Sequence, residues 1–351
     1  MTDPSPHPSL RGPSSNPERA SDLFSPLLRQ AIRKRQPFLR SRTPAAFRAF
    51  GGSADGIDGV FIDVFASGAV LNVYEGRPPR WFRAVENAGY ALDVLSEIGV
   101  RAIYLKPFAK DRSKLGGELP TCATDPVPAA GEALDEALLI EENGYRLEVR
   151  LFDGLSTGLF LDQRANRAWV AQRVKAGPPP DILNTFAYTC AFSVAAARAG
   201  AATTSVDVSG RYLEWGKRNF AHNGLDVSSH RFAKMDTFEF LAYARRKGLS
   251  YDLIILDPPS FASGSRKKGI RPWSSTSDYA RLVRDSAAVL KPAGTIFASS
   301  NTHELCIGDH LKREVAKGIG HDPKWLKLPG MPPDFAGEHG RFAACACVPD
   351  P

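Results

Sequence analysis

The sequence predicts an α/β protein in which a mostly parallel sheet, covered by helices on both faces, follows a smaller N-terminal α/β domain. Three observations predict this architecture. Strand-like and helix-like segments alternate regularly after residue 151, which is typical of a parallel sheet with helical connections. The chain has 351 residues, of which 43% are hydrophobic, enough for two hydrophobic cores. Short apolar runs before residue 151 have the length of strands.

The first 48 residues differ in composition from the rest of the chain. Residues 1–20 are rich in Pro and Ser and contain almost no large apolar side chains, so we expect a disordered tail. Residues 21–48 combine apolar positions at helical spacing with basic residues, and we expect a partly helical segment. Its basic cluster fits either a solvated helix face or a surface that contacts RNA phosphates. The cluster comprises Arg29, Arg33, Lys34, Arg35, Arg40, Arg42 and Arg48.

Residues 49–151 are predicted to form the smaller α/β domain. Strands are expected at residues 60–65, 69–74 and 101–105, with an apolar-periodic helix at 81–98. The domain ends in a hairpin, with strands at 137–141 and 145–151 around Glu142, Asn143 and Gly144. No residue of this domain indicates catalysis by itself.

Residues 152–351 are predicted to form the sheet domain. The last two expected strands, at 325–328 and 341–348, fit an antiparallel pair at the edge of a mixed sheet. The other strands are expected at residues 181–186, 203–207, 230–232, 251–257 and 294–300. The helices between them are expected at residues 163–175, 192–199, 210–223, 237–247 and 278–290.

Composition limits the classes of protein. No stretch approaches the roughly 18 apolar residues of a membrane-spanning helix, and the first residues lack the features of a signal peptide, so we expect a cytoplasmic protein without a membrane partner. The five cysteines show no spacing typical of a metal site, which predicts reduced thiols and no metal. The net charge of +7 favours an anionic partner. No feature indicates an oligomeric state.

Acidic residues follow three of the predicted strands, at the edge where a doubly wound sheet binds ligands. Asp207 ends the second strand, at a spacing near the roughly 20 residues expected of an acid that holds a ribose diol. Asp236 follows the third strand, where it is placed to accept a hydrogen bond from an adenine amino group. Alternatively, Asp236 caps the helix that begins at Thr237. The turn at 187–190 leads into a helix whose first amides can face a ligand carboxylate.

The fourth strand runs into Asp257, Pro258 and Pro259. The two prolines fix φ and remove two amide donors, so we expect a rigid corner whose carbonyl groups are free to accept hydrogen bonds from a substrate. A planar base fits between this corner and Phe261. The alternative is an ordinary Pro turn after a buried strand. No glycine fingerprint for a dinucleotide follows the first strand, which argues against a nicotinamide enzyme.

Four segments together resemble the bacterial family of large-subunit ribosomal RNA methyltransferases that make 5-methylcytosine or 7-methylguanine. The resemblance extends from about residue 49 to the end of the chain. It implies a Rossmann-like class I methyltransferase sheet, S-adenosyl-L-methionine as the cofactor, and RNA, ribosomal RNA in particular, as the partner. The segments are TGLFLDQR at 157–164, LNTFAYT at 183–189, SVDVS at 205–209 and DPPSF at 257–261.

The resemblance also implies roles for individual residues. Asp207 binds the cofactor's ribose, Asp236 its adenine and the segment around Tyr188 its methionine part, while residues 160–164 close the pocket. Asp257, Pro258 and Pro259 are expected to orient the acceptor atom, because methyl transfer needs alignment more than acid–base power. The residues expected to bind the cofactor are Phe160, Gln163, Arg164, Phe186, Ala187, Tyr188, Asp207, Val208, Asp236, Thr237 and Asp257.

The sequence departs from the 5-methylcytosine members of the family at one position. Those members are similar to each other in having a nucleophilic Cys after the fifth strand, where this sequence has Asn301. Cys306, five positions further, is expected to be a small buried residue in the next helix. Members that methylate a guanine nitrogen resemble this sequence in having Asn there. A nitrogen acceptor of the guanine type is therefore favoured over cytosine carbon 5.

A second departure is that the RNA-binding module found at the N-terminus of many relatives is missing. Segment 263–273 is the expected substitute, because it is basic, has Gly264 and Gly269 as hinges, and follows the Asp-Pro-Pro corner directly. Its alternative is a disordered surface loop. The residues expected to contact RNA are Phe261, Arg266, Lys267, Lys268 and Arg271.

Two other functions fit parts of the sequence. One is a methyltransferase for a small molecule or a protein, since a fold does not determine its substrate. The other is a non-catalytic ribosome-assembly protein that binds RNA with the same fold. The acids at Asp207, Asp236 and Asp257 argue against a protein without turnover.

Overall fold

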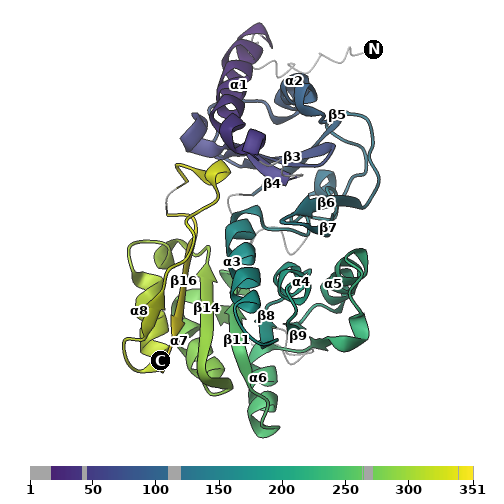
Figure 1. The fold of residues 1–351 in the computed structure, drawn as a ribbon. Coiled ribbons are helices and arrows are strands. Elements are labelled where there is room, and N and C mark those ends of the chain that lie inside the picture. The colour runs from purple at the N-terminus through teal and green to yellow at the C-terminus, as the bar shows by residue number, and fades with distance from the viewer. Residues whose placement is uncertain are drawn as a thin grey trace, which may run out of the picture.

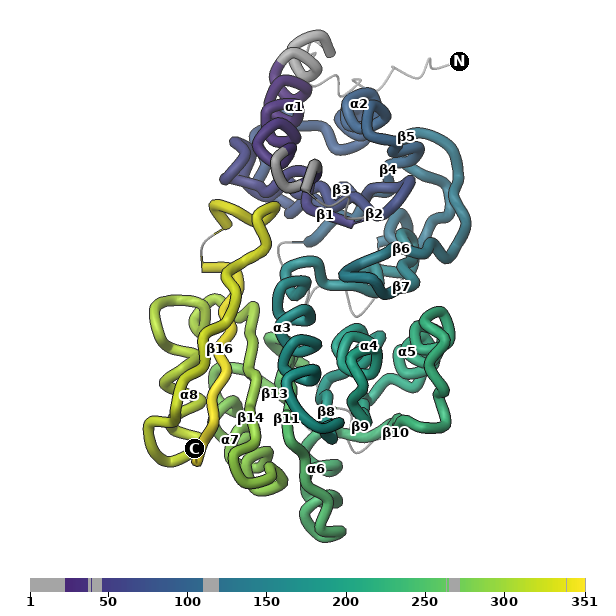
Figure 2. The backbone as a smooth tube through the Cα atoms, viewed as in Figure 1, coloured from purple at the N-terminus to yellow at the C-terminus, as the bar shows by residue number. Residues whose placement is uncertain are grey.

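The computed structural model describes residues 17–41, 46–109, 120–262, 264, 272–338 and 340–350. Figure 1 shows a smaller N-terminal part, in purple and blue, and a larger part with the central sheet, in teal to yellow. The chain near the C-terminus reaches from the larger part to the smaller one before it returns (Figure 2). The segment before β16 therefore contacts the N-terminal part where the two parts join.

The N-terminal part is a five-stranded sheet with two helices on one face. Its elements are α1 (Pro17–Ser41), β1 (Ala46–Gly51), β2 (Val60–Phe65), β3 (Gly68–Tyr74), α2 (Ala84–Leu95), β4 (Ala102–Phe108) and β5 (Ala130–Gly131). In the order β1-β2-β3-β4-β5, only β3 and β4 are parallel neighbours. α1 packs on the sheet through Phe24, Leu28 and Ala31, which recur at helical spacing and are fully buried.

The structure differs from the expectation at both ends of the basic segment. α1 begins at Pro17, within the expected disordered tail, and β1 begins at Ala46, within the expected helical segment. The sequence pattern does not indicate β1, because Arg48 interrupts the apolar residues of this strand. The guanidinium of Arg48 donates to Asp63 at 2.8 Å and to Glu338 at 2.7 Å, so its charge is neutralised inside the fold.

The predicted hairpin is confirmed and lies between the two sheets. Its strands are β6 (Leu138–Glu142) and β7 (Tyr145–Val149). Asn143 and Gly144 between them have φ of 51° and 80°, and two successive left-handed residues are typical of a type I′ turn. Ile140 of the hairpin shares one buried cluster with Tyr104 of β4 and Phe220 of the larger part. The hairpin therefore joins the cores of the two parts.

The larger part contains a seven-stranded sheet. Its strands are β8 (Asp181–Thr185), β9 (Ala202–Asp207), β10 (Arg231–Lys234), β11 (Tyr251–Leu256), β14 (Leu290–Ser300), β15 (Lys324–Leu326) and β16 (Ala343–Val348). In the order β10-β9-β8-β11-β14-β16-β15, the first five are parallel and β16 is antiparallel to both neighbours. The predicted parallel sheet and the antiparallel pair at its edge are both confirmed.

Helices cover both faces of this sheet, as predicted (Figure 1). They are α3 (Arg164–Lys175), α4 (Ala191–Arg198), α5 (Gly210–His222), α6 (Thr237–Arg246), α7 (Ser275–Ala287) and α8 (His310–Ile319). Successive side chains of β11 point to opposite faces. Leu253 and Ile255 pack with Val170 of α3, whereas Ile254 packs with Leu282 of α7. This burial on both sides explains the unbroken apolar run in β11.

A short hairpin of β12 (Phe261–Ala262) and β13 (Trp273–Ser274) frames the basic segment after the Asp-Pro-Pro corner. The hairpin fixes where that segment leaves and rejoins the fold, between the end of β11 and the start of α7. The four basic residues expected to contact RNA, Arg266, Lys267, Lys268 and Arg271, lie outside the described residues.

Buried ion pairs hold the two parts together. Arg164, at the start of α3, donates to both carboxylate oxygens of Asp334 at 2.8 and 3.1 Å, and to the carbonyl of Ala46 in β1. Asp334 also accepts from the amide of Arg48, and its carbonyl accepts from the side chain of Arg35. Arg35 and Arg48, counted in the basic cluster of the N-terminal segment, therefore serve the interface between the parts.

Candidate functional site

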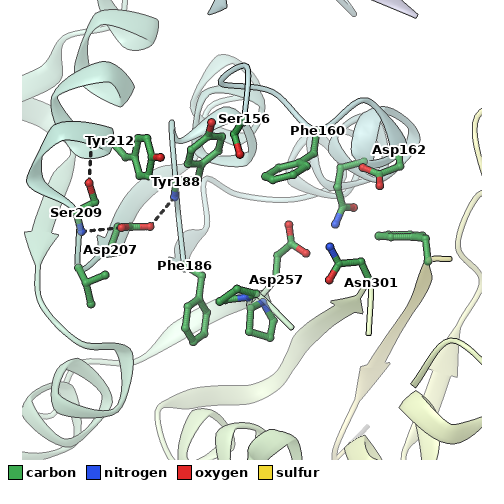
Figure 3. Close-up of a pocket in the computed structure, with 15 residues that line it drawn as sticks. Ser156, Phe160, Asp162, Phe186, Tyr188, Asp207, Ser209, Tyr212, Asp257 and Asn301 are labelled. Carbon is green, nitrogen blue, oxygen red and sulfur yellow. Dashed lines mark hydrogen bonds between the residues drawn. The ribbon is translucent and has the colours of Figure 1, made fainter. Parts of the chain in front are cut away.

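A cavity of about 310 Å³ opens at the carboxyl ends of the parallel strands, the edge at which such sheets bind ligands. Its volume is in the range of small-molecule sites. Figure 3 shows Asp207 and Tyr212 at one end of the cavity and Asp257 and Asn301 at the other. The lining comprises Ser156, Phe160, Asp162, Gln163, Phe186, Tyr188, Asp207, Val208, Ser209, Tyr212, Asp257, Pro258, Pro259, Asn301 and Phe342.

The loop between β8 and α4 has an unusual backbone. Phe186, Tyr188 and Cys190 have φ of 52°, 49° and 61°, in the left-handed region that glycine favours. The sequence lacks glycines here, yet alternate residues adopt the conformation of glycine. Bulky left-handed residues persist only where the surrounding structure holds them, and they gather at ligand sites. Two of the three side chains, those of Phe186 and Tyr188, line the cavity.

Asp207 holds this loop through its carboxylate. Oδ2 accepts a hydrogen bond from the amide of Tyr188 at 2.9 Å, and Oδ1 accepts one from the amide of Ser209 at 2.8 Å (Figure 3). Each oxygen keeps a further lone pair, so the carboxylate can still accept from two ligand hydroxyls. Burial raises the pKa of Asp207, although both amide bonds oppose this shift. A ribose diol fits such a pair of acceptors.

Aromatic rings form the middle wall of the cavity. Tyr188 packs edge-on against Tyr212 with ring centroids 4.5 Å apart, and Phe160 lies 5.5 Å from Tyr188. The hydroxyl of Tyr188 accepts from the amide of Gly158 at 2.9 Å. Gly158 has a φ of +95°, and a Cβ atom there would lie 2.3 Å from Trp215. Glycine is therefore required for the segment that carries Phe160 to reach the cavity.

Asp257 ends β11 at the other end of the cavity. The hydroxyl of Ser299 donates to its Oδ1 at 2.7 Å, and Nε2 of Gln163 donates to that hydroxyl at 3.0 Å. Burial raises the pKa of Asp257 to about 6, and the nearby charge of Asp162 acts in the same direction. Asp257 is therefore mostly ionised at neutral pH and offers a hydrogen-bond acceptor to the cavity.

The Pro-Pro corner is present, but one of its two carbonyl groups is occupied. The carbonyl of Pro259 accepts from Nε1 of Trp273 at 2.7 Å and from the hydroxyl of Ser275 at 2.9 Å. The expectation that this carbonyl is free to bind a substrate is therefore wrong, because β13 and α7 supply its partners. The carbonyl of Pro258 is left as the candidate. Phe261, on β12, is 66% exposed and is not part of the cavity lining.

Asn301 follows β14 and lines the cavity beside Asp257 (Figure 3). The hydroxyl of Ser260 donates to its Oδ1 at 2.7 Å, which ties the end of β14 to the Asp-Pro-Pro corner. Cys306 was expected in the next helix, but it follows a short 3₁₀ turn ahead of α8, is half-buried, and contacts the carbonyl of Ser300. None of the described residues that line the cavity is a cysteine.

Four residues expected to bind the cofactor lie outside the cavity lining, namely Arg164, Ala187, Asp236 and Thr237. Arg164 pairs with Asp334, and Ala187 is buried within the β8–α4 loop. Oδ1 of Asp236 accepts from the amides of Phe238 and Glu239 at 2.9 and 3.3 Å, so Asp236 caps α6. The sequence had left this capping role open.

Four lining residues had been given no role from the sequence, namely Ser156, Ser209, Tyr212 and Phe342. Asp162 lies in the 160–164 segment that was expected to close the pocket, and its side chain lines the cavity. Ser209 caps α5 by accepting from the amide of Tyr212 at 3.3 Å, and a Ser directly before a helix is a local signal. Phe342 comes from the chain just before β16, and no local pattern connects it to the site.

Two features are absent from the part of the chain that the structure describes. No three His, Cys, Asp or Glu side chains gather there as they would around a metal ion. No helix within the same ranges is both long and apolar enough to cross a membrane.

The sheet order and the cavity at the carboxyl ends of the strands define a Rossmann-like α/β protein with a small-molecule site. The chain belongs to the S-adenosylmethionine-dependent methyltransferase family, whose model matches residues 120–338. Its cofactor is S-adenosyl-L-methionine. The family and the cofactor expected from the sequence motifs are thus confirmed.

Relatives with similar sequences and structures agree with this family. YwbD of Bacillus subtilis (strain 168) is 37% identical over 281 residues, which are 80% of this chain and 67% of YwbD. Ribosomal RNA large subunit methyltransferase I of Shewanella amazonensis is 30% identical over 310 residues, 87% of this chain and 74% of that protein. The crystal structure of SMU.776 in complex with SAH superimposes with a TM-score of 0.77 at 30% identity, covering 93% of this chain and 81% of that one.

Proposed function

We propose that this enzyme methylates a base of RNA, and that ribosomal RNA is its substrate. The relative from Shewanella amazonensis is named a ribosomal RNA large subunit methyltransferase. The net charge of +7 suits a polyanionic substrate. A ribosomal RNA substrate implies that the enzyme works in the cytoplasm.

The two ends of the cavity suggest how the cofactor is held. S-adenosylmethionine, when bound, supplies a methyl group on a sulfonium that leaves as a neutral thioether. Asp207 holds the ribose with the lone pairs that its amide bonds leave available. Phe186 and Val208 contact the adenine, and Asp236 reaches its amino group through Oδ2, since only Oδ1 takes part in the cap of α6. Tyr188 and Gln163 contact the methionine part.

The choice of acceptor rests on one observation at the end of the cavity where the acceptor base is proposed to bind. Methylation of cytosine carbon 5 in this family needs a thiolate after β14, and Asn301 lies there beside Asp257. A ring or exocyclic nitrogen of a guanine-type base already has the lone pair that attacks the methyl group, so alignment is sufficient. Asp257 and the carbonyl of Pro258 orient that nitrogen, and Phe160 and Phe342 exclude water from the cavity.

A nucleoside analysis tests this function. Large-subunit ribosomal RNA from a strain that lacks the gene is incubated with the enzyme and isotopically labelled S-adenosylmethionine, then digested for mass spectrometry. We expect one labelled methylguanine, and much less of it with Asp207→Ala when S-adenosylmethionine is limiting. Label in 5-methylcytosine would contradict the nitrogen acceptor, whereas unlabelled RNA beside labelled protein or small molecules would contradict an RNA substrate.

A further inference from the structure

A second and larger cavity, of about 1040 Å³, adjoins the cofactor cavity. The two share four lining residues, Phe160, Asp162, Asn301 and Phe342. The larger cavity therefore begins at the reacting end, beside the position proposed for the acceptor base. Its other walls come from the N-terminal sheet and from the chain before β16, which lie close together in Figures 1 and 2. We call this larger cavity the inter-domain cleft.

The wall from the N-terminal sheet carries a pair of stacked rings. Tyr74 and Phe108 end the parallel strands β3 and β4 and lie opposite each other in the register. Their ring centroids are 4.7 Å apart and their planes differ by 11°. Phe160 forms part of the facing wall and is 47% exposed. Aromatic rings in an open cleft stack on bases of any sequence, because every base has a π-face.

Two arginines line the inter-domain cleft, Arg77 just after β3 and Arg341 just before β16. The side chains of Arg77 and Arg341 are 54% and 39% exposed, and both approach the same carboxylate, Asp58, at 3.7 and 4.0 Å. Two cations share one exposed acid, so both retain the ability to bind phosphate. Arg48 differs from them, because it is held between Asp63 and Glu338 and neutralises the cleft's buried acid at Glu338.

The inter-domain cleft is a fixed feature of the fold. Arg48 bridges β2 and the chain before β16, and the buried pair of Arg164 with Asp334 joins α3 to the same chain. Tyr74, Arg77 and Phe108 lie before residue 120, where the match to the family model begins. The family match therefore assigns no role to this wall.

We propose that the inter-domain cleft binds the unpaired RNA strand that flanks the target base. A neighbouring base stacks at the Tyr74–Phe108 pair, and the adjoining phosphates contact Arg77 and Arg341. The reasoning rests on the proposed RNA substrate. A base inside a duplex cannot reach a cavity at the strand ends of this sheet, so it leaves its stack, and the exposed neighbours need sequence-tolerant support. Stacking rings beside cations provide that support for single strands.

The test uses the full-length enzyme and a single-stranded 15-nucleotide RNA that contains 2-aminopurine. Tyr74→Leu and Phe108→Leu keep apolar volume but remove the ring faces, and Arg77→Met with Arg341→Met removes the two charges. Tyr243→Leu on α6 and Arg284→Met on α7 are matched controls, because these exposed residues line neither cavity. Thermal unfolding and S-adenosylmethionine affinity verify that each variant is folded.

We expect each ring variant to weaken RNA binding by roughly 5- to 150-fold and to reduce the quenching of 2-aminopurine on binding. The double arginine variant should make the slope of log affinity against log salt shallower by about 0.7 for each lost phosphate contact. Control variants should match the wild type. Wild-type affinity, quenching and salt slope in folded cleft variants would overturn this proposal and leave the RNA substrate intact. A wild-type enzyme that binds and methylates no RNA would overturn both.

Discussion

The amide of Tyr188 donates a hydrogen bond of 2.9 Å to Oδ2 of Asp207. This bond joins the left-handed loop after β8 to the end of β9, which are neighbouring strands of the sheet. One carboxylate therefore shapes the loop and, in our proposal, binds the cofactor's ribose. Loss of this carboxylate should affect both tasks.

Asp207→Ala should lower the affinity for S-adenosylmethionine. Losing hydrogen bonds to a charged group costs roughly 1.5 to 3 kcal/mol, or about 10- to 100-fold in affinity. Isothermal titration calorimetry measures this change. Asp226→Ala is the matched control, because the carboxylate of Asp226 bonds within its own turn to Ser228 and Ser229 among the described residues. Equal affinities of wild type and Asp207→Ala would remove Asp207 from the cofactor site.

Asp257→Asn should stabilise the protein while it lowers activity. The folded state raises the pKa of Asp257 from 3.8 to about 6 through burial, so it binds the proton more tightly than the unfolded chain. The stability from this tighter binding is fully present below pH 4 and is lost as the pH rises through 6. Asn carries no charge, so the variant should gain on the order of 2 to 3 kcal/mol above pH 6 and little below pH 4.

Urea unfolding between pH 4 and 8 checks this pH dependence, with Asp309→Asn, an exposed aspartate, as the control. Methyl transfer by the wild type should also fall as the pH drops below about 6, because protonation removes the charge of Asp257 and makes it a weaker hydrogen-bond acceptor for the base. A stability difference that is the same at all pH values would show that Asp257 is not shifted in this way.

The enzyme should form no covalent adduct with RNA. Asn301 occupies the place where a thiol would be needed, and burial raises the pKa of Cys190 to about 12 and that of Cys306 to about 11. Neither thiol is reactive near neutral pH. Denaturing gels with RNA that contains 5-fluorocytosine detect such an adduct. A stable adduct that disappears in Cys306→Ser or Cys190→Ser would restore cytosine carbon 5 as the acceptor.

The basic segment after the Asp-Pro-Pro corner should contribute to RNA binding. Changing Arg266, Lys267, Lys268 and Arg271 to Ser should preserve cofactor affinity and make the salt dependence shallower by up to about 0.7 to 0.9 per lost phosphate contact. Arg245→Ser with Arg246→Ser, at the end of α6, shows the effect of removing two positive charges from another part of the surface. If the variant has wild-type kinetics and an unchanged salt slope, this segment does not contribute to RNA binding. The inter-domain cleft would then remain as the proposed RNA-binding face.

Arg164→Met should destabilise the protein more than it weakens cofactor binding. Its guanidinium pairs with Asp334, whose side chain is fully buried, and removing one partner of a buried pair costs about 3 to 5 kcal/mol. The double variant with Asp334→Asn should recover part of that loss, since no unpaired charge remains. Thermal unfolding and calorimetry separate the two effects. A normal melting temperature with lost cofactor affinity would return Arg164 to the cofactor site.

The elements that were predicted correctly are those that depend on short, local sequence patterns. The apolar run of β11 and the turn at Asn143 are visible in a few consecutive residues, and the strands and hairpin built on them are confirmed. β1 was not predicted from the sequence because it contains Arg48. The two acids that pair with Arg48 are Asp63 and Glu338, which lie 15 and 290 positions away along the chain. In the sequence, a charged residue within a strand resembles a solvent-exposed residue, because its buried partner is not among its neighbours.

The sequence by itself determined the alternation of strands and helices, and with it the edge of the sheet at which both Asp207 and Asp257 lie. Periodicity is local, and parallel strands place their carboxyl ends on one side. Only the tertiary structure decided that Arg164 pairs with Asp334 and that Phe342 reaches the cavity. These contacts join residues that are far apart in the chain. Which residues become buried together depends on the folded structure, and no local sequence pattern identifies them.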